Sequence, residues 1–335
     1  MISHSKPNIT TTDLARVNDV LAGGNISNGR QVAQFEQALS DFLHTPFVHT
    51  VASGSVAIEI ALKALGVGLR DEVILPTYVC KDVLTAVERC GATPILCDIG
   101  LDWRMTPIFV EPLISPATKA IIIVHIFGLV TNVEAFRQYN IPLVEDACQS
   151  FGSATDARLS GTVADIGVFS FHATKMLTTG EGGAVATHSQ ALSDKVTALS
   201  EAYRMSDLSA ALGVSQLAHF DSALTFRRQL AREYAQVLQH KSVRLPTVRN
   251  DECLFRFVFQ SEGGVFEELQ QAFAQRGIAI RQGVDALLHR ITSMDSQAFK
   301  NAESLYRSTV SIPFYPALTQ AEIESVKCAM EDLIE

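Results

Sequence analysis

The chain has 335 residues, more than one average domain needs, and its length indicates about two domains. It is 47% hydrophobic and 19% charged, which supplies a large core and excludes a disordered or low-complexity protein. The 27 basic and 36 acidic residues give a net charge of −9, and no basic block stands out. This balance argues against a nucleic-acid-binding protein.

The six cysteines are scattered and form no C-x-x-C pair, which favours reduced thiols over a disulfide framework or a zinc site. The polar first twenty residues lack the apolar stretch of a signal peptide, and the run 120–124 is too short to cross a bilayer. The sequence therefore predicts a soluble cytoplasmic protein with no metal site and no membrane partner.

The first two thirds of the chain alternate helical periodicity with short apolar runs. Apolar residues at helical spacing predict a helix from Val32 to Phe42, and the run 47–51 predicts a strand. After Ser53-Gly54-Ser55, Ile58, Leu62 and Leu65 mark a second helix. Six further strands are predicted at 72–75, 94–97, 120–125, 143–145, 167–171 and 184–187. Such β-branched runs between helices indicate a mostly parallel, seven-stranded sheet covered on both faces, and thus an α/β fold.

The pattern changes beyond residue 190. A long connecting helix is predicted at 228–240, and the remaining elements are a strand at 254–260, a helix at 265–275, a strand near Ile278 and a helix at 321–333. We therefore expect a large domain over 1–240, with the N-terminal segment and the connecting helix, and a small α+β domain over 241–335.

A predicted strand, the turn Ser53-Gly54-Ser55 and a helix follow one another near the start of the large domain. Small residues at such a turn let backbone N–H groups and the helix N-terminus approach an anion, most simply a phosphate. The same residues are also ordinary helix caps, so the segment alone leaves both interpretations open.

Two polar residues follow a later strand in the segment LVEDACQS. Asp146 stands at the strand's C-terminal end, where α/β sheets bind ligands, and Gln149 comes three residues later. The alternative is a capping box, since Asp is a favoured N-cap and Gln can bond back to it.

A lysine lies in the otherwise uncharged stretch between Gly167 and Gly180, after a strand that ends at Ser170. Lys175 in such surroundings can be partly desolvated, which favours a nucleophilic amine suited to Schiff-base chemistry. A lysine that reaches solvent is the alternative. His125 and His172 also follow strands and could face the same cleft, although histidines of this kind often only pack.

These features together suit pyridoxal phosphate. That cofactor needs an anion site for its phosphate, a lysine for its aldehyde, and an acid that keeps its ring nitrogen protonated. Asp146 could be the acid, Gln149 could bond the ring oxygen, and Ser170 could join Gly54 and Ser55 at the phosphate. No competing metal, dinucleotide, P-loop or serine-hydrolase motif is found in the sequence.

At these residues the sequence resembles the DegT/StrS-type family of pyridoxal-phosphate-dependent sugar aminotransferases. The likeness covers most of the chain, in the segments GRQVAQFEQAL, VASGSVAIEIALKALGVGLRDEVILP, TKAIIIVHIFG, VEDACQSFGS, FSFHATKMLTTGEGG, RMSDLSAALGVSQL and IPFYPALTQAEI. It implies an aspartate-aminotransferase-like fold (fold type I) and a homodimer whose active site lies at the subunit interface.

The resemblance also implies residue roles. Lys175 holds the cofactor covalently as the internal aldimine, Asp146 pairs with the ring nitrogen, and Gln149 meets the ring hydroxyl. The phosphate contacts fall to three further residues: Gly54, Ser55 and Ser170.

Three departures from the family pattern are visible. Cys80 stands where an aromatic residue commonly covers the cofactor ring, and Ala202 replaces an asparagine that reaches the partner's phosphate. The segment between Gly183 and Arg204 is also shorter than usual.

The function implied is transfer of an amino group from an amino acid, L-glutamate by resemblance, to a nucleotide-linked keto sugar in polysaccharide or secondary-metabolite synthesis. Asn28, Gly29, His125, Arg281 and His289 are candidate contacts for the sugar substrate. Two alternatives stay open: a sugar dehydratase or lyase of the same fold, and a non-catalytic regulatory descendant. The dehydratase branch replaces the aldimine lysine with histidine, whereas Lys175 is kept here.

Overall fold

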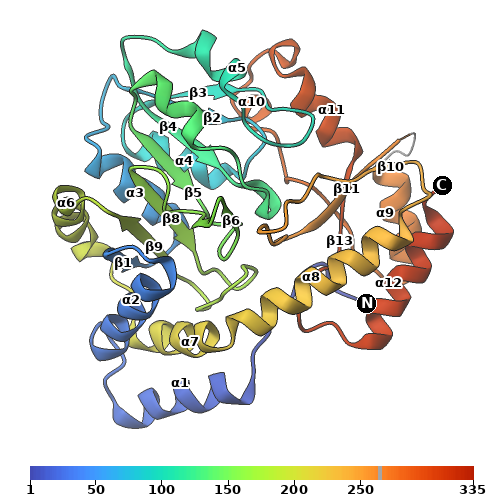
Figure 1. Cartoon of the computed structure of the whole chain (residues 1–335), viewed down its shortest axis with the longest axis horizontal. Coiled ribbons are helices and arrows are strands. Elements are labelled where there is room, and N and C mark those ends of the chain that lie inside the picture. The colour runs from blue at the N-terminus through green and yellow to red at the C-terminus, as the bar shows by residue number, and fades with distance from the viewer. Residues whose placement is uncertain (263–265) are drawn as a thin grey trace.

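The computed structural model describes residues 1–262 and 266–335. The fold consists of a large part built on a seven-stranded sheet and a smaller part built on a four-stranded sheet (Figure 1). The strands of the large sheet are β1 (Phe47–Val51), β2 (Glu72–Pro76), β3 (Thr93–Cys97), β4 (Thr118–Val124), β5 (Leu143–Asp146), β8 (Ile166–Ser170) and β9 (Gly183–Thr187). All seven predicted strands of this sheet are confirmed.

The strand order in the large sheet is β1-β9-β8-β5-β4-β2-β3. The five strands from β8 to β3 pair in parallel, whereas β9 runs antiparallel to both of its neighbours. Because parallel strands end at one edge of the sheet, residues that follow β4, β5 and β8 come together there.

Helices cover both faces of the large sheet, as the apolar strands predict. On β4, Ile121 and Ile123 enter the core on one face, whereas Ile122 and Val124 enter the core on the other. The helices of this part are α1 (Thr11–Gly23), α2 (Arg30–Leu43), α3 (Gly54–Ala64), α4 (Lys81–Arg89), α5 (Pro107–Val110), α6 (Gln190–Ser200) and α7 (Asp207–Ala218). A short hairpin of β6 (Ala154–Thr155) and β7 (Arg158–Leu159) projects from the sheet.

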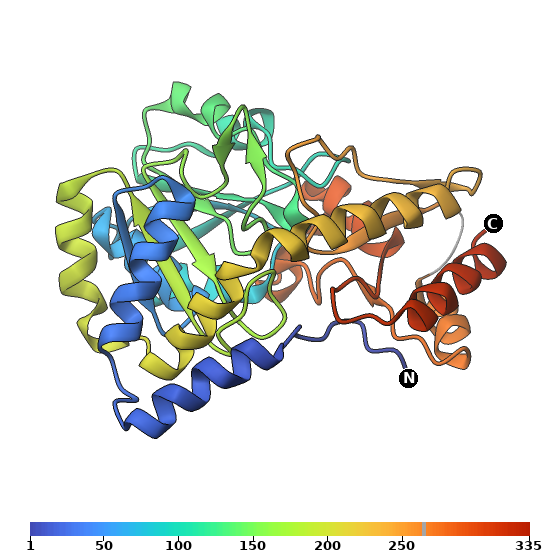
Figure 2. The same ribbon diagram turned by 60° about the horizontal axis from the view of Figure 1, so that its bottom comes forward.

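Helix α8 (Phe220–Val237) connects the two parts and is longer than the predicted helix at 228–240 (Figures 1 and 2). The small sheet has the order β10-β11-β13-β12. Its elements are β10 (Val243–Arg244), β11 (Phe257–Ser261), β12 (Arg281–Gln282) and β13 (Thr309–Ile312), with α9 (Phe266–Gln275), α10 (Leu288–Ile291), α11 (Lys300–Ser308) and α12 (Gln320–Leu333). Residue 265, the predicted start of α9, lies outside the described residues.

The first residues of the chain pack against the small sheet rather than the large one. Ile2 forms a parallel bridge with Ile278, and the His4 ring lies 2.9 Å from the hydroxyl oxygen of Ser311 on β13. Figure 2 shows this segment reaching the small part, where both termini lie. The boundary near residue 240 stays a prediction, but the N-terminal segment belongs structurally to both parts.

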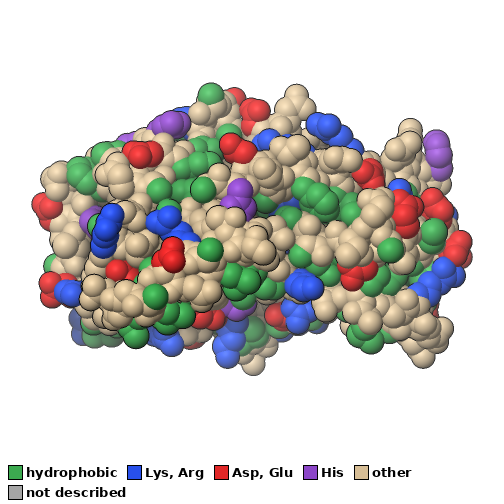
Figure 3. Space-filling view, turned by 90° about the horizontal axis from the view of Figure 1, so that it is seen from below, with side chains coloured by type: hydrophobic (Ala, Val, Ile, Leu, Met, Phe, Trp, Pro, Cys, Tyr) green, Lys and Arg blue, Asp and Glu red, His purple; other side chains and the backbone are tan. Residues whose placement is uncertain are grey.

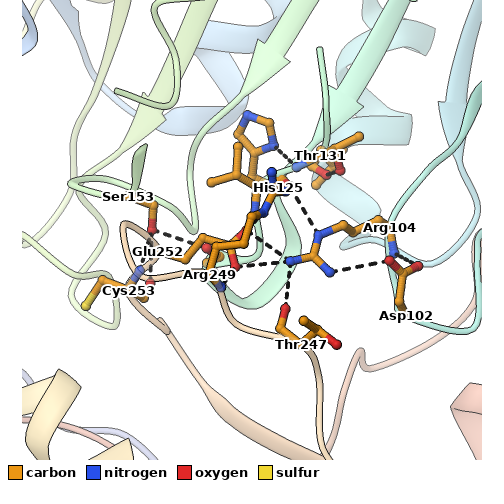
Figure 4. Close-up of polar contacts among 12 residues, drawn as sticks. Asp102, Arg104, His125, Thr131, Ser153, Thr247, Arg249, Glu252 and Cys253 are labelled. Atoms are coloured by element: carbon orange, nitrogen blue, oxygen red, sulfur yellow. Dashed lines mark hydrogen bonds and ion pairs between the residues drawn. The ribbon is translucent and has the colours of Figure 1, made fainter. Parts of the chain in front are cut away.

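A buried charge network joins the two parts (Figure 4). The carboxylate of Glu252 accepts bonds from the Arg104 guanidinium at 2.9 and 3.1 Å, and from the backbone N–H groups of Val130 and Arg249 at 2.8 Å each. Arg104 also donates to the carbonyl oxygens of Val130 and Thr247, at 3.1 and 3.0 Å. The network fixes the segment that leads into β11.

Replacing Glu252 with glutamine should destabilise the protein markedly. Glu252 and Arg104 are both buried, and without Glu252 the only acid left to Arg104 among the described residues is the half-exposed Asp102 at 3.3 Å, so the loss should cost about 3 kcal/mol. The measurement is the melting temperature of E252Q. Glu134, an exposed acid paired with Arg158, is the matched control, and its glutamine variant should melt close to wild type. Equal melting of E252Q and E134Q would contradict this role for the network.

Candidate active site

The predicted cofactor residues meet at the edge of the large sheet where β5 and β8 end. Asp146 is the last residue of β5, with 3% of its surface exposed, and lies in register with Val168 of β8. Its Oδ1 accepts the backbone N–H of Cys148 at 3.0 Å. This bond fixes the carboxylate and leaves the second oxygen outside that contact.

The loop after β8 holds Lys175 in a defined position. Phe171, Met176 and Leu177 are buried on either side of it, and its own N–H donates to the carbonyl oxygen of His172 at 2.9 Å. The Lys175 ammonium lies 5.2 Å from the ring centre of Phe255, which comes from the segment entering the small sheet. Both parts of the fold therefore frame this lysine.

The turn before α3 forms a cradle with β8. Gly54 is the first residue of α3, and a Cβ built on it would lie 2.6 Å from the Ser170 Cβ and 2.9 Å from its Oγ. Only glycine permits this approach, which brings the N-terminus of α3, Ser55 included, beside the Ser170 hydroxyl. Backbone N–H groups at a helix N-terminus with a hydroxyl next to them suit a phosphate.

Adding a methyl group at Gly54 tests whether the cradle binds the phosphate. Gly54→Ala should weaken pyridoxal phosphate binding about tenfold or more, because Ser170 is held by its strand and the helix end must move away. Gly23→Ala is the control, since no atom of the described part of the chain lies within 4 Å of a Cβ at that position. The measurement is a cofactor titration of both variants, and equal affinities would count against the cradle.

Gln149 is oriented by a neighbouring loop. Its Oε1 accepts the backbone N–H of Phe127 at 2.9 Å. Because the Phe127 N–H can only donate, it holds the amide oxygen Oε1 of Gln149 and leaves the amide nitrogen Nε2 pointing away from this bond. Nε2 is a hydrogen-bond donor, which is the group that the ring hydroxyl oxygen of the cofactor needs. Phe127 adopts a left-handed conformation with φ 59°, and Gly128 follows with φ 93°.

Two thiols stand beside these groups. Cys80 caps α4 and is reached by solvent, yet desolvation raises the pKa of its thiol, an effect that the Lys175 charge opposes and the Asp146 charge reinforces. Burial, with the charge of Asp146, raises the pKa of Cys148 further. Both side chains are therefore neutral thiols close to Asp146 and Lys175.

Two of the predicted substrate residues have other partners in the structure. His125 is fully buried, with Nε2 2.7 Å from Glu145 and Nδ1 accepting the N–H of Thr131 at 3.0 Å. His289 is equally buried, between the Thr77 hydroxyl at 2.8 Å and Glu303 at 3.0 Å. Neither ring has a nitrogen left for a substrate, so we do not propose them as substrate contacts.

The other predicted residues are placed as follows. Asn28 donates to the Met205 carbonyl oxygen at 3.2 Å, and Gly29 packs on Asp207, so both lie against the start of α7 rather than beside Lys175. His172 is half-exposed, and its Nδ1 contacts the Thr174 hydroxyl at 3.0 Å. Arg281 lines a small cleft that also contains Thr174.

Sequence reasoning missed Phe255, whose ring approaches Lys175 from the other part of the fold, and Arg256, which lies against that ring. The available signal was the single charge in the apolar run LFRFVF, at a position where strand patterning predicts burial.

The site fits the phosphate, ring nitrogen, ring oxygen and aldehyde of pyridoxal phosphate with one group each. In the described ranges 1–262 and 266–335, no cluster of three or more His, Cys, Asp or Glu side chains could hold a metal ion. The helices in those ranges include none with the length and apolar character of a membrane span. On the face drawn in Figure 3, basic and acidic side chains are interspersed.

Comparison with known proteins finds similar proteins over most of the chain. The family profile described as "DegT/DnrJ/EryC1/StrS aminotransferase family" matches residues 7–331. A GDP-perosamine synthase of Escherichia coli O157:H7 is 33% identical over 68% of this chain and 69% of its own length. The spore coat polysaccharide biosynthesis protein SpsC of Bacillus subtilis is 27% identical, over 100% and 97%. The PLP-form structure of a putative sugar aminotransferase, Spr1654 from Streptococcus pneumoniae, superposes with a TM-score of 0.92 at 25% identity, covering 98% and 97%.

Proposed function

Because the chain belongs to the DegT/DnrJ/EryC1/StrS aminotransferase family, we propose that it aminates a nucleotide-linked keto sugar, with L-glutamate as the amino donor. The enzyme class, an aminotransferase that uses pyridoxal phosphate, follows from the family and favours this reaction over a dehydratase or a non-catalytic protein. The observation that carries the proposal is the convergence of Lys175, Asp146, Gln149 and the Gly54–Ser170 cradle at one edge of the sheet. The sugar acceptor is supported by the relatives named as GDP-perosamine synthases.

The proposal gives a separate task to each of four side chains: Lys175, Asp146, Gln149 and Ser170. When bound, pyridoxal phosphate supplies an electron sink for the carbon that loses its proton. The Lys175 amine would take that proton from the substrate carbon and return it to the cofactor carbon, acting as a general base and then a general acid held in place by its loop. Asp146 keeps a negative charge at the ring nitrogen, and Gln149 and Ser170 orient the two ends of the ring.

The same proposal includes a homodimer. Leu14 and Leu21 on α1 and Ile26 after it expose 57%, 51% and 47% of their surfaces, and a second subunit would cover such a stretch. Asn28 and Gly29 follow directly, so we assign them to the sugar side of an interface site. Light scattering on the protein as it elutes from a size-exclusion column tests for the dimer, and a monomer at micromolar concentration would contradict it.

We place the enzyme in the cytoplasm, since all six cysteines are free.

The visible absorption spectrum tests the donor half of the reaction. The purified protein with pyridoxal phosphate should be yellow, should bleach when L-glutamate is added, and should regain its colour with 2-oxoglutarate. A yellow protein that ignores glutamate but bleaches with another amino acid would replace the donor. A protein that bleaches with no amino acid would contradict transamination.

A further inference from the structure

A small cleft rich in positive charge opens beside the Lys175 loop, and we call it the arginine pocket. The residues of this pocket that the argument uses are His4, Lys6, Thr174, Arg227, Arg256 and Arg281. They come from the N-terminal segment, the Lys175 loop, α8, the residue just before β11, and β12. Five separate segments thus converge on a cavity of about 40 Å³, which is room for a few water molecules.

The positive charge of the arginine pocket is not neutralised within the described chain. Arg227, Arg256 and Arg281 make no salt bridge with any acid in residues 1–262 and 266–335. Arg256 donates to the Gly283 carbonyl oxygen at 3.1 Å. Burial lowers the pKa of Arg256, and the charge of Asp285 opposes this shift. Arg227 is buried, Arg256 is half-buried and Arg281 is exposed, and three arginines without a paired acid among the described residues that line one cleft suit an external anion.

Buried polar atoms that find no partner among residues 1–262 and 266–335 point to the same conclusion. Arg227 is only 4% exposed and uses one nitrogen for the Phe255 and Phe314 carbonyl oxygens, at 3.0 and 3.1 Å, while its Nε has no partner. The buried Nδ1 of His4 also lacks a partner, and desolvation, helped by Arg256 and Arg281, lowers the pKa of His4 to about 3. Buried polar atoms without partners are rare in folded proteins and often mark the place of a missing ligand.

The arginine pocket is within reach of the reacting amine. The Phe255 ring centre lies 5.2 Å from the Lys175 Nζ and 5.5 Å from the Arg256 guanidinium carbon. Thr174, the neighbour of Lys175 in sequence, lines the pocket itself. A substrate that reacts at Lys175 can therefore place an anionic end group among the arginines.

We propose that the arginine pocket binds an anionic oxygen group of a substrate, a carboxylate or a phosphate, while the substrate reacts beside Lys175. This rests on the proposed aminotransferase reaction. The cavity has the size of a carboxylate rather than of a sugar nucleotide, and a carboxylate of the amino donor fills it. Arg256 and Arg281 supply the charge, and Arg227 shapes the inner wall.

Calorimetric titration of the protein loaded with pyridoxal phosphate tests the pocket directly. Glutarate, a dicarboxylate without an amino group, and inorganic phosphate are the two probes. Arg256→Gln and Arg281→Gln should each weaken the dissociation constant of the bound probe about tenfold to a hundredfold. Arg244→Gln, on the exposed strand β10 of the same sheet, should bind as wild type does.

The two probes separate the two sources of the anion. Tighter binding of glutarate assigns the pocket to the amino donor, and tighter binding of phosphate assigns it to the sugar substrate. Failure of wild type to bind either probe, or unchanged binding in both arginine variants, would overturn the proposal. Because Arg281 is exposed, its variant should melt as wild type does and remains informative if Arg256→Gln misfolds.

A half-reaction distinguishes failure of the pocket from failure of the proposed function. With the pocket on the donor side, R281Q should need about ten times more glutamate for half-maximal bleaching, with a maximal rate close to wild type. If wild type binds glutarate through the arginines but bleaches with no amino acid, the pocket stands and the transamination proposal falls. If bleaching proceeds in wild type and in R281Q with equal glutamate dependence, the donor assignment of the pocket falls.

Discussion

Lys175→Ala should abolish turnover, with a loss of at least about a thousandfold in kcat. Alanine removes both the amine that attaches the cofactor and the group that moves the substrate proton. Neither task has a substitute nearby, because the adjacent thiols have raised pKa values and Asp146 is held by the Cys148 N–H. The yellow colour should also change, since the cofactor would be bound without its covalent link. The measurement is steady-state transamination together with the absorption spectrum.

Two further variants separate the amine from the charge at this position. Lys175→Arg keeps a cation over the Phe255 ring but is no base at neutral pH, so it should be as inactive as the alanine variant. Lys300→Ala, at the exposed start of α11, should leave activity unchanged. Activity near wild type in K175A would remove Lys175 from the mechanism.

The large sheet could be predicted because its strands are apolar on both faces. In the run from Ile121 to Val124 the residues alternate between two cores, so the sequence shows no polar face and reads as a buried strand. The small sheet is harder to predict from the sequence, because its strand β12 has only two residues, Arg281 and Gln282, which are too few to show an alternation of apolar and polar residues. Only its pairing with β13 makes it a strand.

The same distinction explains which site residues could be found. Asp146, Ser170 and Lys175 lie at or just after the ends of recognisable strands, where parallel sheets place their ligands. Phe255 reaches Lys175 from the other part of the fold, and the Arg104–Glu252 network and the close approach of Gly128 hold the segment just before it in place. A Cβ on Gly128 would lie 2.2 Å from the Cys253 carbonyl oxygen. No local pattern encodes that contact.

The two candidate histidines show a different limit. In sequence, nothing distinguishes His125, at a strand end, or His289, in the short helix α10, from other residues at such positions. Their partners, Glu145 and Glu303, lie twenty and fourteen residues away along the chain. Burial without a free nitrogen is a property of the folded chain, and the sequence pattern cannot distinguish it from a ligand site.

The three departures from the family pattern now have a structural setting. Cys80 stands at the N-cap position of α4, and its small thiol gives the position where an aromatic ring is common little stacking surface. Ala202 lies in the single 3₁₀ turn Glu201–Tyr203 that follows helix α6. The carbonyl oxygen of Tyr203 in the same turn accepts the Ala52 N–H at 2.8 Å. This hydrogen bond ties the end of the shortened segment to the chain just before the turn Ser53-Gly54-Ser55.

Asp146→Asn should lower kcat roughly a hundredfold or more while leaving the fold intact. Asparagine has the same shape and can still accept the Cys148 N–H, but it carries no charge to keep the ring nitrogen protonated. The carbon that loses its proton then has no electron sink, so the proton-transfer step slows. The measurements are the rate of bleaching by glutamate and the melting temperature of the cofactor-loaded variant.

The neighbouring carboxylate provides the control. Glu145 points to the opposite side of β5, where it accepts bonds from His125 at 2.7 Å and from the N–H groups of Gly161, Val163 and Ala164 at 2.6, 2.8 and 3.0 Å. Burial alone would raise the pKa of Glu145, but these bonds outweigh it and lower the pKa. Glu145→Gln should therefore reduce the melting temperature and leave the bleaching rate of the folded protein near wild type. If D146N bleached as fast as E145Q, the charge at Asp146 would have no part in the reaction. The two substitutions would then differ only in their effect on the melting temperature.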